Sequence, residues 1–197
     1  MFRTRMLLTT LVLAGGFLAA TATAHAGLIP NKVTVTPDSG SFRWTYNVVV
    51  TSDVYVQPGD YFTIYDFAGP VTAQPTAPNT DWAVSTQNVG ITPDKTNPQD
   101  DSNIPNYTWT YQGSVKIQGS AGLGNFSIMS PFSLSALSDF TSATHRQDND
   151  KSENNITSTV VPVAAVPPPS EESPEPATLA LFGAALPFAW LKLRRRS

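Results

Sequence analysis

One histidine is the first candidate for acid–base chemistry. His145 is the only histidine after residue 26. A serine hydrolase would need it beside an activated serine, yet the chain has no Gly-x-Ser-x-Gly turn, and Gly119-Ser120-Ala121-Gly122 has the wrong spacing. We therefore predict that His145 is a structural or exposed residue at the end of a strand, and we predict no catalytic residues.

Paired carboxylates could hydrolyse a glycosidic bond if the fold held them about 5 to 9.5 Å apart. Asp53, Asp60 and Asp66 lie on or beside predicted strands. Asp60 directly follows Pro58-Gly59, a position where a side chain commonly caps backbone amides. No glutamate occurs between residues 27 and 149. Turn and edge roles are therefore favoured, and a hydrolase is the third choice among the functions considered below.

A second pattern has oxygen ligands at alternate positions. Asp148, Asp150 and Ser152 resemble the opening of a calcium-binding loop. In such a loop the sixth position would be Glu153 and the twelfth Thr159, so the turn glycine and the bidentate glutamate are both missing. A metal site at these three residues is thus the alternative to a solvated hydrophilic loop, and no cofactor is expected.

Aromatic side chains could bind a sugar by stacking. Tyr107, Trp109 and Tyr111 share one face of a strand, because side chains alternate along it with a period of two. Aromatic faces suit the apolar faces of sugars, but aromatic residues also build the cores of β-sandwiches. Sugar stacking and core packing therefore both remain open for this strand.

The elements that position these residues are predicted to be β-strands. Residues 41–51 alternate so that one face carries Phe42, Trp44, Tyr46, Val48 and Val50. Turns are expected at Pro37-Asp38-Ser39-Gly40 and at Gln57-Pro58-Gly59. Further strands are expected at 32–36, 60–67, 82–86, 107–117, 125–129, 140–144 and 156–161, with long surface loops at 71–81 and 92–105. About eight short strands without an amphipathic helix predict an all-β fold, an antiparallel β-sandwich of Greek-key or jelly-roll type.

Charge and cysteine content exclude several classes of function. Between residues 27 and 173 there are six lysines and arginines but fourteen acidic residues. Such a domain repels phosphate backbones, so we expect no nucleic-acid partner. The chain has no cysteine, which excludes disulfides, thiol nucleophiles, cysteine-ligated metals and a lipoprotein anchor. A lack of thiols also fits an oxidising compartment.

The first 26 residues have the three parts of a secretory signal peptide. A positive start with Arg3 and Arg5 precedes an apolar run over residues 6–20, and Ala24-His25-Ala26-Gly27 supplies an A-x-A cleavage site. We predict cleavage by signal peptidase after Ala26. A permanent membrane anchor is the alternative, but the run is shorter than the roughly 20 residues that span a bilayer.

The other end begins with a proline-rich linker at residues 164–173, which favours an extended spacer. Pro174-Glu175-Pro176 follows, and residues 177–191 carry no charge. We predict one transmembrane helix over residues 177–193, which ends in a basic cluster of Lys192, Arg194, Arg195 and Arg196. Because basic flanks stay in the cytoplasm, this cluster places the upstream chain outside the membrane, in agreement with the signal peptide.

This tail closely resembles the PEP-CTERM sorting signal of Gram-negative bacteria that make exopolysaccharide. The resemblance covers residues 173–197 and matches the order and spacing of Pro174-Glu175-Pro176, the apolar helix and Arg194-Arg195-Arg196. It implies processing by exosortase, a membrane-embedded cysteine transpeptidase, at or near the Pro-Glu-Pro. The stretch 42–69, with its string Tyr-Phe-Thr-Ile-Tyr-Asp-Phe, also resembles the start of an ectodomain family of PEP-CTERM proteins, a resemblance that implies no activity. An ordinary single-pass anchor is the alternative.

Together these features predict an exported protein of the cell envelope, the cell surface or the extracellular matrix. Residues 27–163 would form a non-enzymatic β-sandwich ectodomain. The alternative is a carbohydrate-binding or adhesive module with extracellular polysaccharide as its partner. The chain would be held in the membrane by its C-terminal helix before processing.

Overall fold

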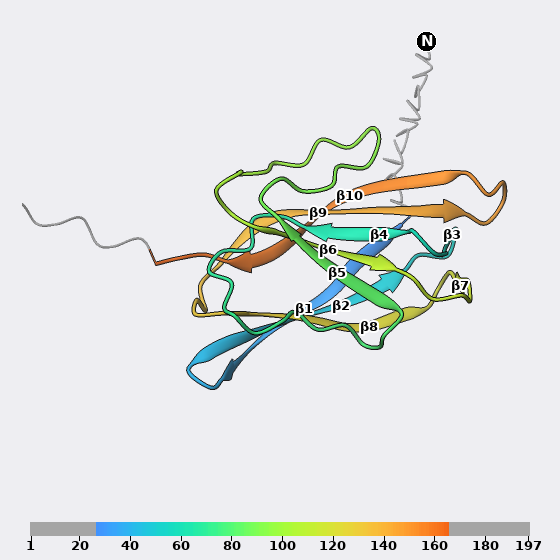
Figure 1. The fold of residues 1–197 in the computed structure, drawn as a ribbon. Helices are drawn as coiled ribbons and strands as arrows, with labels where there is room; N and C mark the ends of the chain where they lie inside the picture. Colours follow the sequence, from blue (N-terminus) through green and yellow to red (C-terminus); the bar gives the residue numbers. More distant parts are fainter. Residues whose placement is uncertain (1–26, 166–197) are drawn as a thin grey trace, which may run out of the picture.

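The strands of this protein form two antiparallel sheets around a shared core (Figure 1). The structure is a computed structural model and describes residues 27–165. The strands in this part of the chain are β1 (Leu28–Asp38), β2 (Ser41–Val50), β3 (Val54–Val56), β4 (Tyr61–Ile64), β5 (Trp82–Gln87), β6 (Asn106–Tyr111), β7 (Ile117–Gln118), β8 (Gly122–Ser130), β9 (Ser135–Arg146) and β10 (Ser152–Pro162). The three-stranded sheet has the order β1-β2-β8. The seven-stranded sheet has the order β5-β6-β4-β9-β3-β7, and β10 pairs with β9.

The predicted all-β core of antiparallel sheets is therefore confirmed. Within residues 27–165, no helix is long and apolar enough to cross a membrane. The predicted signal peptide, the linker beyond residue 165 and the sorting tail lie outside the described residues.

The hairpin between β1 and β2 follows directly from its turn residues. Asp38 pairs with Ser41, which leaves a two-residue connection. Ser39 and Gly40 have φ values of 51° and 82°, as in the type I′ turn that matches the twist of two antiparallel strands. The predicted turn at residues 37–40 is confirmed, and it sets the register of β2.

The alternation along β2 builds half of the core. Trp44, Tyr46 and Val48 are fully buried, while the residues between them are partly exposed. From the larger sheet, Phe62 packs against the rings of four other aromatic residues, at centroid distances of 4.8 to 5.8 Å. These partners are Trp82, Trp109, Phe126 and Phe140.

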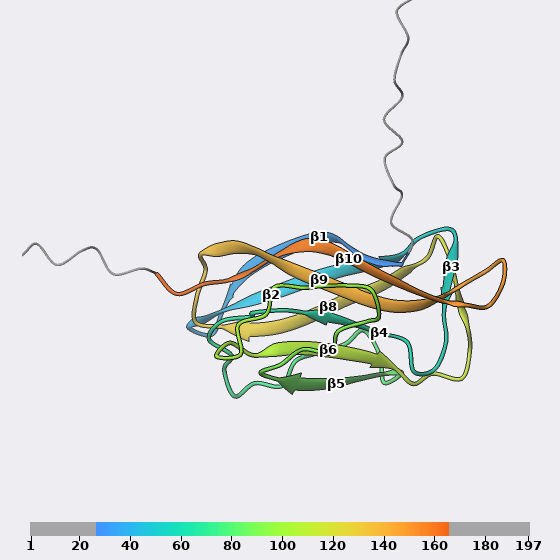
Figure 2. The same ribbon diagram turned by 90° about the horizontal axis from the view of Figure 1, so that it is seen from above.

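The long strand β9 organises the larger sheet. One edge of β9 pairs with β10 along its length, and the other edge pairs with both β4 and β3. Residues 57–60 loop out between β3 and β4, because both of these short strands continue along the same edge. The larger sheet also curls, so that β9 and β10 reach the start of β1 (Figure 2).

A single strand over residues 107–117 was expected, and this prediction is wrong. β6 ends at Tyr111, and β7 pairs instead with β3. The chain folds back over the Tyr111 ring, and the Tyr111 hydroxyl donates to the carbonyl of Val115 at 2.7 Å. A side chain at Gly113 would lie 2.3 Å from that hydroxyl, so glycine permits the reversal.

The long connection between β5 and β6 covers the outer face of the larger sheet. The Tyr65 hydroxyl donates to the carbonyl of Ile91, which belongs to this connection, at 2.7 Å. The Tyr65 side chain is fully buried. Asp66 and Asp139 accept backbone amides of Asp101 and Gln99, at 2.9 and 2.6 Å. The predicted irregular segment at residues 92–105 is therefore a loop that is fastened to the sheet.

Candidate functional site

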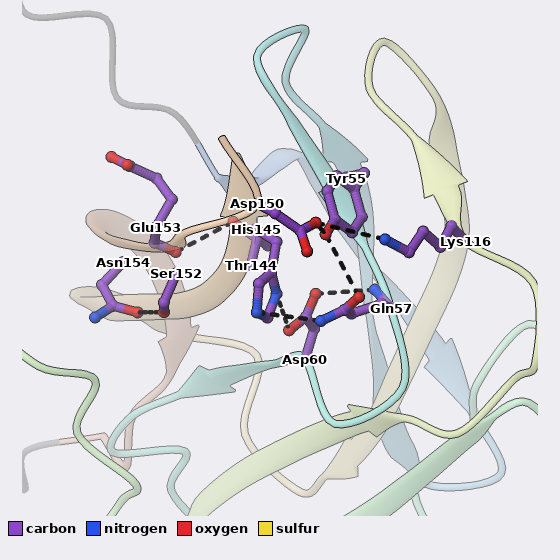
Figure 3. Close-up of polar contacts among 10 residues, drawn as sticks. All are labelled: Tyr55, Gln57, Asp60, Lys116, Thr144, His145, Asp150, Ser152, Glu153 and Asn154. Carbon is purple, nitrogen blue, oxygen red and sulfur yellow. Dashed lines mark hydrogen bonds and ion pairs between the residues drawn. The ribbon is translucent and has the colours of Figure 1, made fainter. Parts of the chain in front are cut away.

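A cluster of polar and aromatic side chains lies at one end of the two sheets, where β3, β7 and the β9–β10 hairpin meet (Figures 1 and 3). We call it the loop-end cluster and define it as Tyr55, Gln57, Asp60, Lys116, His145 and Asp150. It contains the only histidine of the described residues. Its members come from three segments that are far apart in sequence.

The centre of the cluster is a close contact between Asp60 and His145. The Nδ1 atom of His145 lies 2.9 Å from Oδ1 of Asp60, without the alignment of a hydrogen bond. The carboxylate is 5% exposed and the imidazole 25%. Burial raises the pKa of Asp60, while the backbone amide of Gln57 and the nearby His145 oppose this effect.

The turn at residues 57–60 holds Asp60 in place. Asp60 donates its amide to the carbonyl of Gln57 at 3.0 Å, and its Oδ2 accepts the amide of Gln57 at 2.9 Å. Gly59 has φ of 95° after Pro58, which matches a type II turn. The predicted turn at residues 57–59 and the amide-capping role of Asp60 are both confirmed.

The second nitrogen of His145 faces Gln57. Its Nε2 lies 3.1 Å from Nε2 of Gln57, so a neutral imidazole can accept a hydrogen bond from that carboxamide. The Gln57 oxygen is then directed to the Tyr55 hydroxyl at 3.4 Å. The ring of Tyr55 also stacks on that of His145, with centroids 5.8 Å apart.

The outer part of the cluster consists of a lysine, a tyrosine and an aspartate that contact one another. The ammonium of Lys116 lies 4.1 Å from the centroid of the Tyr55 ring and 3.5 Å from Oδ1 of Asp150. The same carboxylate accepts the hydroxyl of Tyr55. These contacts link the β9–β10 hairpin to β3 and to the segment before β7 (Figure 3).

The loop-end cluster can fasten three loops, but its geometry does not match that of a nucleophilic catalyst. A triad needs a serine hydroxyl beside the histidine nitrogen that is not held by aspartate. Here that nitrogen contacts Gln57, and no serine of the described residues bonds to it. The arrangement therefore fits the structural role that was predicted for His145.

The other two aspartates considered for hydrolysis do not pair with Asp60. Asp53 is exposed and accepts the hydroxyl of Ser52 at 2.8 Å. Burial raises the pKa of Asp66, the amide of Asp101 opposes this effect, and the negative charges of nearby aspartates on β9 and on the β5–β6 loop add to it. Each carboxylate is thus used at a turn or a loop, as the sequence favoured.

The aromatic residues proposed for sugar stacking are all in the core. Tyr107, Trp109 and Tyr111 are 4, 0 and 3% exposed. They face the interior because β6 is a central strand whose apolar side lies against the three-stranded sheet. In this structure they offer no accessible ring face, so a stacking platform on this strand is not supported.

The proposed metal ligands are also separated. Asp148 pairs with Arg146 at 3.1 Å, which lowers the pKa of that carboxyl. Asp150 belongs to the loop-end cluster, and Ser152 donates to Asn154 at 3.4 Å. Residues 27–165 contain no group of three or more acidic or histidine side chains that could hold a metal ion. In this structure the three side chains contact three different partners, Arg146, Lys116 and Asn154.

A polar groove on the outer face of the three-stranded sheet was not predicted. We call it the outer groove; its volume is about 290 Å³ and it is lined by Lys32, Thr34, Thr45, Asn47 and Asn125. The register shifts at Pro30/Lys32 and at Val48/Val49 lie beside it. Such bulges redirect side chains.

The remaining predicted site residues can be placed only in part. Gly27 is described, whereas Ala24, Ala26, the Pro174-Glu175-Pro176 motif and the basic cluster that includes Lys192 lie outside the described residues. In comparisons with known proteins, no family model matches this chain and no curated protein shows significant sequence similarity to it.

Sequence reasoning missed the partners in the loop-end cluster. Tyr55, Gln57 and Lys116 carry no local motif, and their contacts join segments up to 95 residues apart. The only local pattern that pointed to this cluster was the Pro58-Gly59 turn. It predicted the position of Asp60 but not its contact with His145.

Proposed function

We propose that this chain is an exported, exosortase-sorted protein of the cell envelope or extracellular matrix, whose non-enzymatic ectodomain is a β-sandwich of Greek-key or jelly-roll type. One observation carries the proposal. β1 begins at Leu28, the second residue after the predicted cleavage site, and β10 ends at Pro162, two residues before the start of the predicted linker. The strands thus occupy the interval that processing at both ends would leave. The aromatic core supports a stable display domain that needs no disulfide.

The test compares two Gram-negative hosts, one with exosortase and one without. Intact mass and fractionation should show a product that starts at Gly27 in both hosts and loses its C-terminal arginines only where exosortase is present. Glu175→Ala should leave the helix able to insert, because the charge lies outside the bilayer core, yet uncleaved precursor should accumulate in the inner membrane. If the wild-type tail stays intact in both hosts, the helix is a plain anchor and the sorting proposal fails.

The outer groove favours a second candidate, the binding of an extracellular polysaccharide. Its lining offers hydroxyl, carboxamide and ammonium groups, which suit hydroxylated and anionic sugars. It contains no acidic side chain, although the domain as a whole is acidic. Lys32 would meet a uronate carboxylate, and Asn47 and Asn125 would bond to hydroxyls.

Co-sedimentation with a uronate-containing polysaccharide tests this candidate. Lys32→Ala and Asn125→Ala should weaken binding, and added salt should weaken the part that depends on Lys32. Lys95→Ala, on the β5–β6 loop, is the matched control and should bind like the wild type. A neutral glucan bound equally well would show that charge does not contribute.

A further inference from the structure

Polar side chains from three parts of the fold hold the backbone of Gly27 and Leu28. The amide of Gly27 donates to Oγ1 of Thr51 at 2.9 Å, and the amide of Leu28 donates to Oγ of Ser142 at 3.0 Å. The carboxamide of Asn155 donates to the carbonyl of Leu28 at 3.3 Å. We call Thr51, Ser142 and Asn155 the Gly27 clamp. They lie directly after β2, on β9 and on β10, which brings both sheets to this point.

Two members of the clamp are buried polar groups. Ser142 and Asn155 are 0 and 2% exposed. Nδ2 of Asn155 has its partner in Leu28, but Oδ1 of Asn155 has none among residues 27–165. A buried carbonyl without a donor is costly, so this atom indicates that a donor is missing.

The clamp accepts only glycine at position 27. A Cβ at Gly27 would lie 2.7 Å from Cβ of Asn155 and 2.9 Å from Oγ of Ser142. The φ of Gly27 is +147°, which residues with side chains rarely adopt. Signal peptidase reads the small residues before the bond, here Ala24 and Ala26. The need for glycine after the bond therefore comes from the fold.

We propose that the α-amino group released at Gly27 by signal cleavage docks in this clamp, with Thr51 Oγ1 and Asn155 Oδ1 as its acceptors. This inference rests on the cleavage after Ala26 that the proposed function includes. Hydrolysis of the Ala26–Gly27 bond consumes one water and leaves a carboxylate on Ala26 and an ammonium on Gly27. The single N–H of the peptide thereby becomes three donors.

The three donors match what the clamp provides. The first keeps the bond to Thr51, and the second is donated to Asn155 Oδ1. The carboxamide carbon of Asn155 lies 3.4 Å from the position of a Gly27 Cβ, so this carboxamide is one of the nearest groups to Gly27. Signal removal thus supplies the donor that the buried oxygen lacks, and the mature chain becomes more stable than its precursor.

The experiment measures how fast the Gly27 amine is acetylated by succinimidyl acetate. The full chain is exported in a host without exosortase and purified, and intact mass first shows whether it starts at Gly27. A different start would overturn the cleavage prediction and the docking together, because no Gly27 amine would exist, whereas a Gly27 start without protection would overturn the docking alone. With the Gly27 start, acetylation should be about tenfold slower in the folded protein than in concentrated urea, a factor that docking by about 1.4 kcal/mol gives.

Peptide mass spectrometry follows each amine separately, with the exposed Lys95 as an internal control. Thr51→Val and Asn155→Ala should each raise the Gly27 rate without changing that of Lys95. Equal rates in folded and unfolded protein would overturn the docking. An unchanged rate in Asn155→Ala would overturn Asn155 as an acceptor.

A second variant gives an answer even if Asn155→Ala folds poorly. Asn155→Asp places a carboxylate beside the ammonium, so the pH at which Gly27 becomes reactive should move upward. A merely structural Asn155 would leave that profile unchanged. Gly27→Ala should keep the cleavage position but lose protection, whereas Gly40→Ala, at a positive φ with no atom within 4 Å of its Cβ, should retain it.

Discussion

The aromatic core around Phe62 and the loop-end cluster stabilise the same fold by different physical means. In the core, five rings pack at 4.8 to 5.8 Å, and the stabilisation follows from apolar area that is removed from water. In the loop-end cluster, the contacts between Asp60, His145 and Gln57 are polar and include a buried carboxyl group whose pKa is raised. The core should therefore contribute more and be insensitive to pH, while the cluster contributes less and depends on pH.

The largest effect is expected in the core. Phe62→Ala should lower the free energy of unfolding by about 3 to 5 kcal/mol, because it leaves a cavity among four rings. Urea denaturation of the exported chain measures this. Val115→Ala is the control, since Val115 is 71% exposed and should change little. A loss below about 1 kcal/mol for Phe62→Ala would contradict the central place of this ring.

The next effect should come from His145. His145→Ala leaves the buried Asp60 carboxyl group without its contact to the imidazole and removes the partner of the Gln57 carboxamide, so we expect a loss of about 1 to 3 kcal/mol. His145→Gln, which can restore one of the two contacts, should fall between the alanine variant and the wild type. Urea denaturation measures the free energy of unfolding of both variants. An alanine variant as stable as the wild type would show that other contacts hold the loops.

A smaller, pH-dependent effect should appear in Asp60→Asn. Because burial raises the pKa of Asp60, the folded state binds this proton more readily than the unfolded state, whose aspartate titrates at about 3.9. The stability that Asp60 contributes is therefore fully present below that value and is lost as the pH rises through the raised pKa.

Asparagine keeps an oxygen for the Gln57 amide and does not titrate. The difference in unfolding free energy between the wild type and Asp60→Asn should thus fall across this pH window and stay constant on either side. Urea midpoints at a series of pH values measure it. A difference that rises with pH would mean that His145 lowers the pKa of Asp60 by more than burial raises it.

The smallest effect should come from the surface pair of Asp148 and Arg146, whose side chains are 62 and 38% exposed. Asp148→Ala should produce no measurable shift in the urea midpoint, because exposed ion pairs are screened by water and salt. Added calcium should likewise shift neither the wild type nor the variant. A calcium-dependent increase in the wild-type midpoint alone would restore the metal site.

Much of the fold could be read from local pattern. The alternation at Trp44, Tyr46 and Val48 predicted the buried face of β2, because side chains of a strand alternate between its two faces whatever lies around it. The hairpin at Ser39-Gly40 and the turn before Asp60 followed from residues that tolerate or pre-set unusual φ values. These features depend on near neighbours in the chain.

Only the tertiary structure decided the roles that depend on distant partners. The pattern at Tyr107, Trp109 and Tyr111 fitted either a sugar platform or a core, and the choice depended on which sheet covers β6. His145 was visible as a lone titratable residue, but its contact with Asp60 exists because β9 pairs beside β3. Local sequence determines which way a side chain points along its strand, whereas the packing of distant strands determines what it meets there.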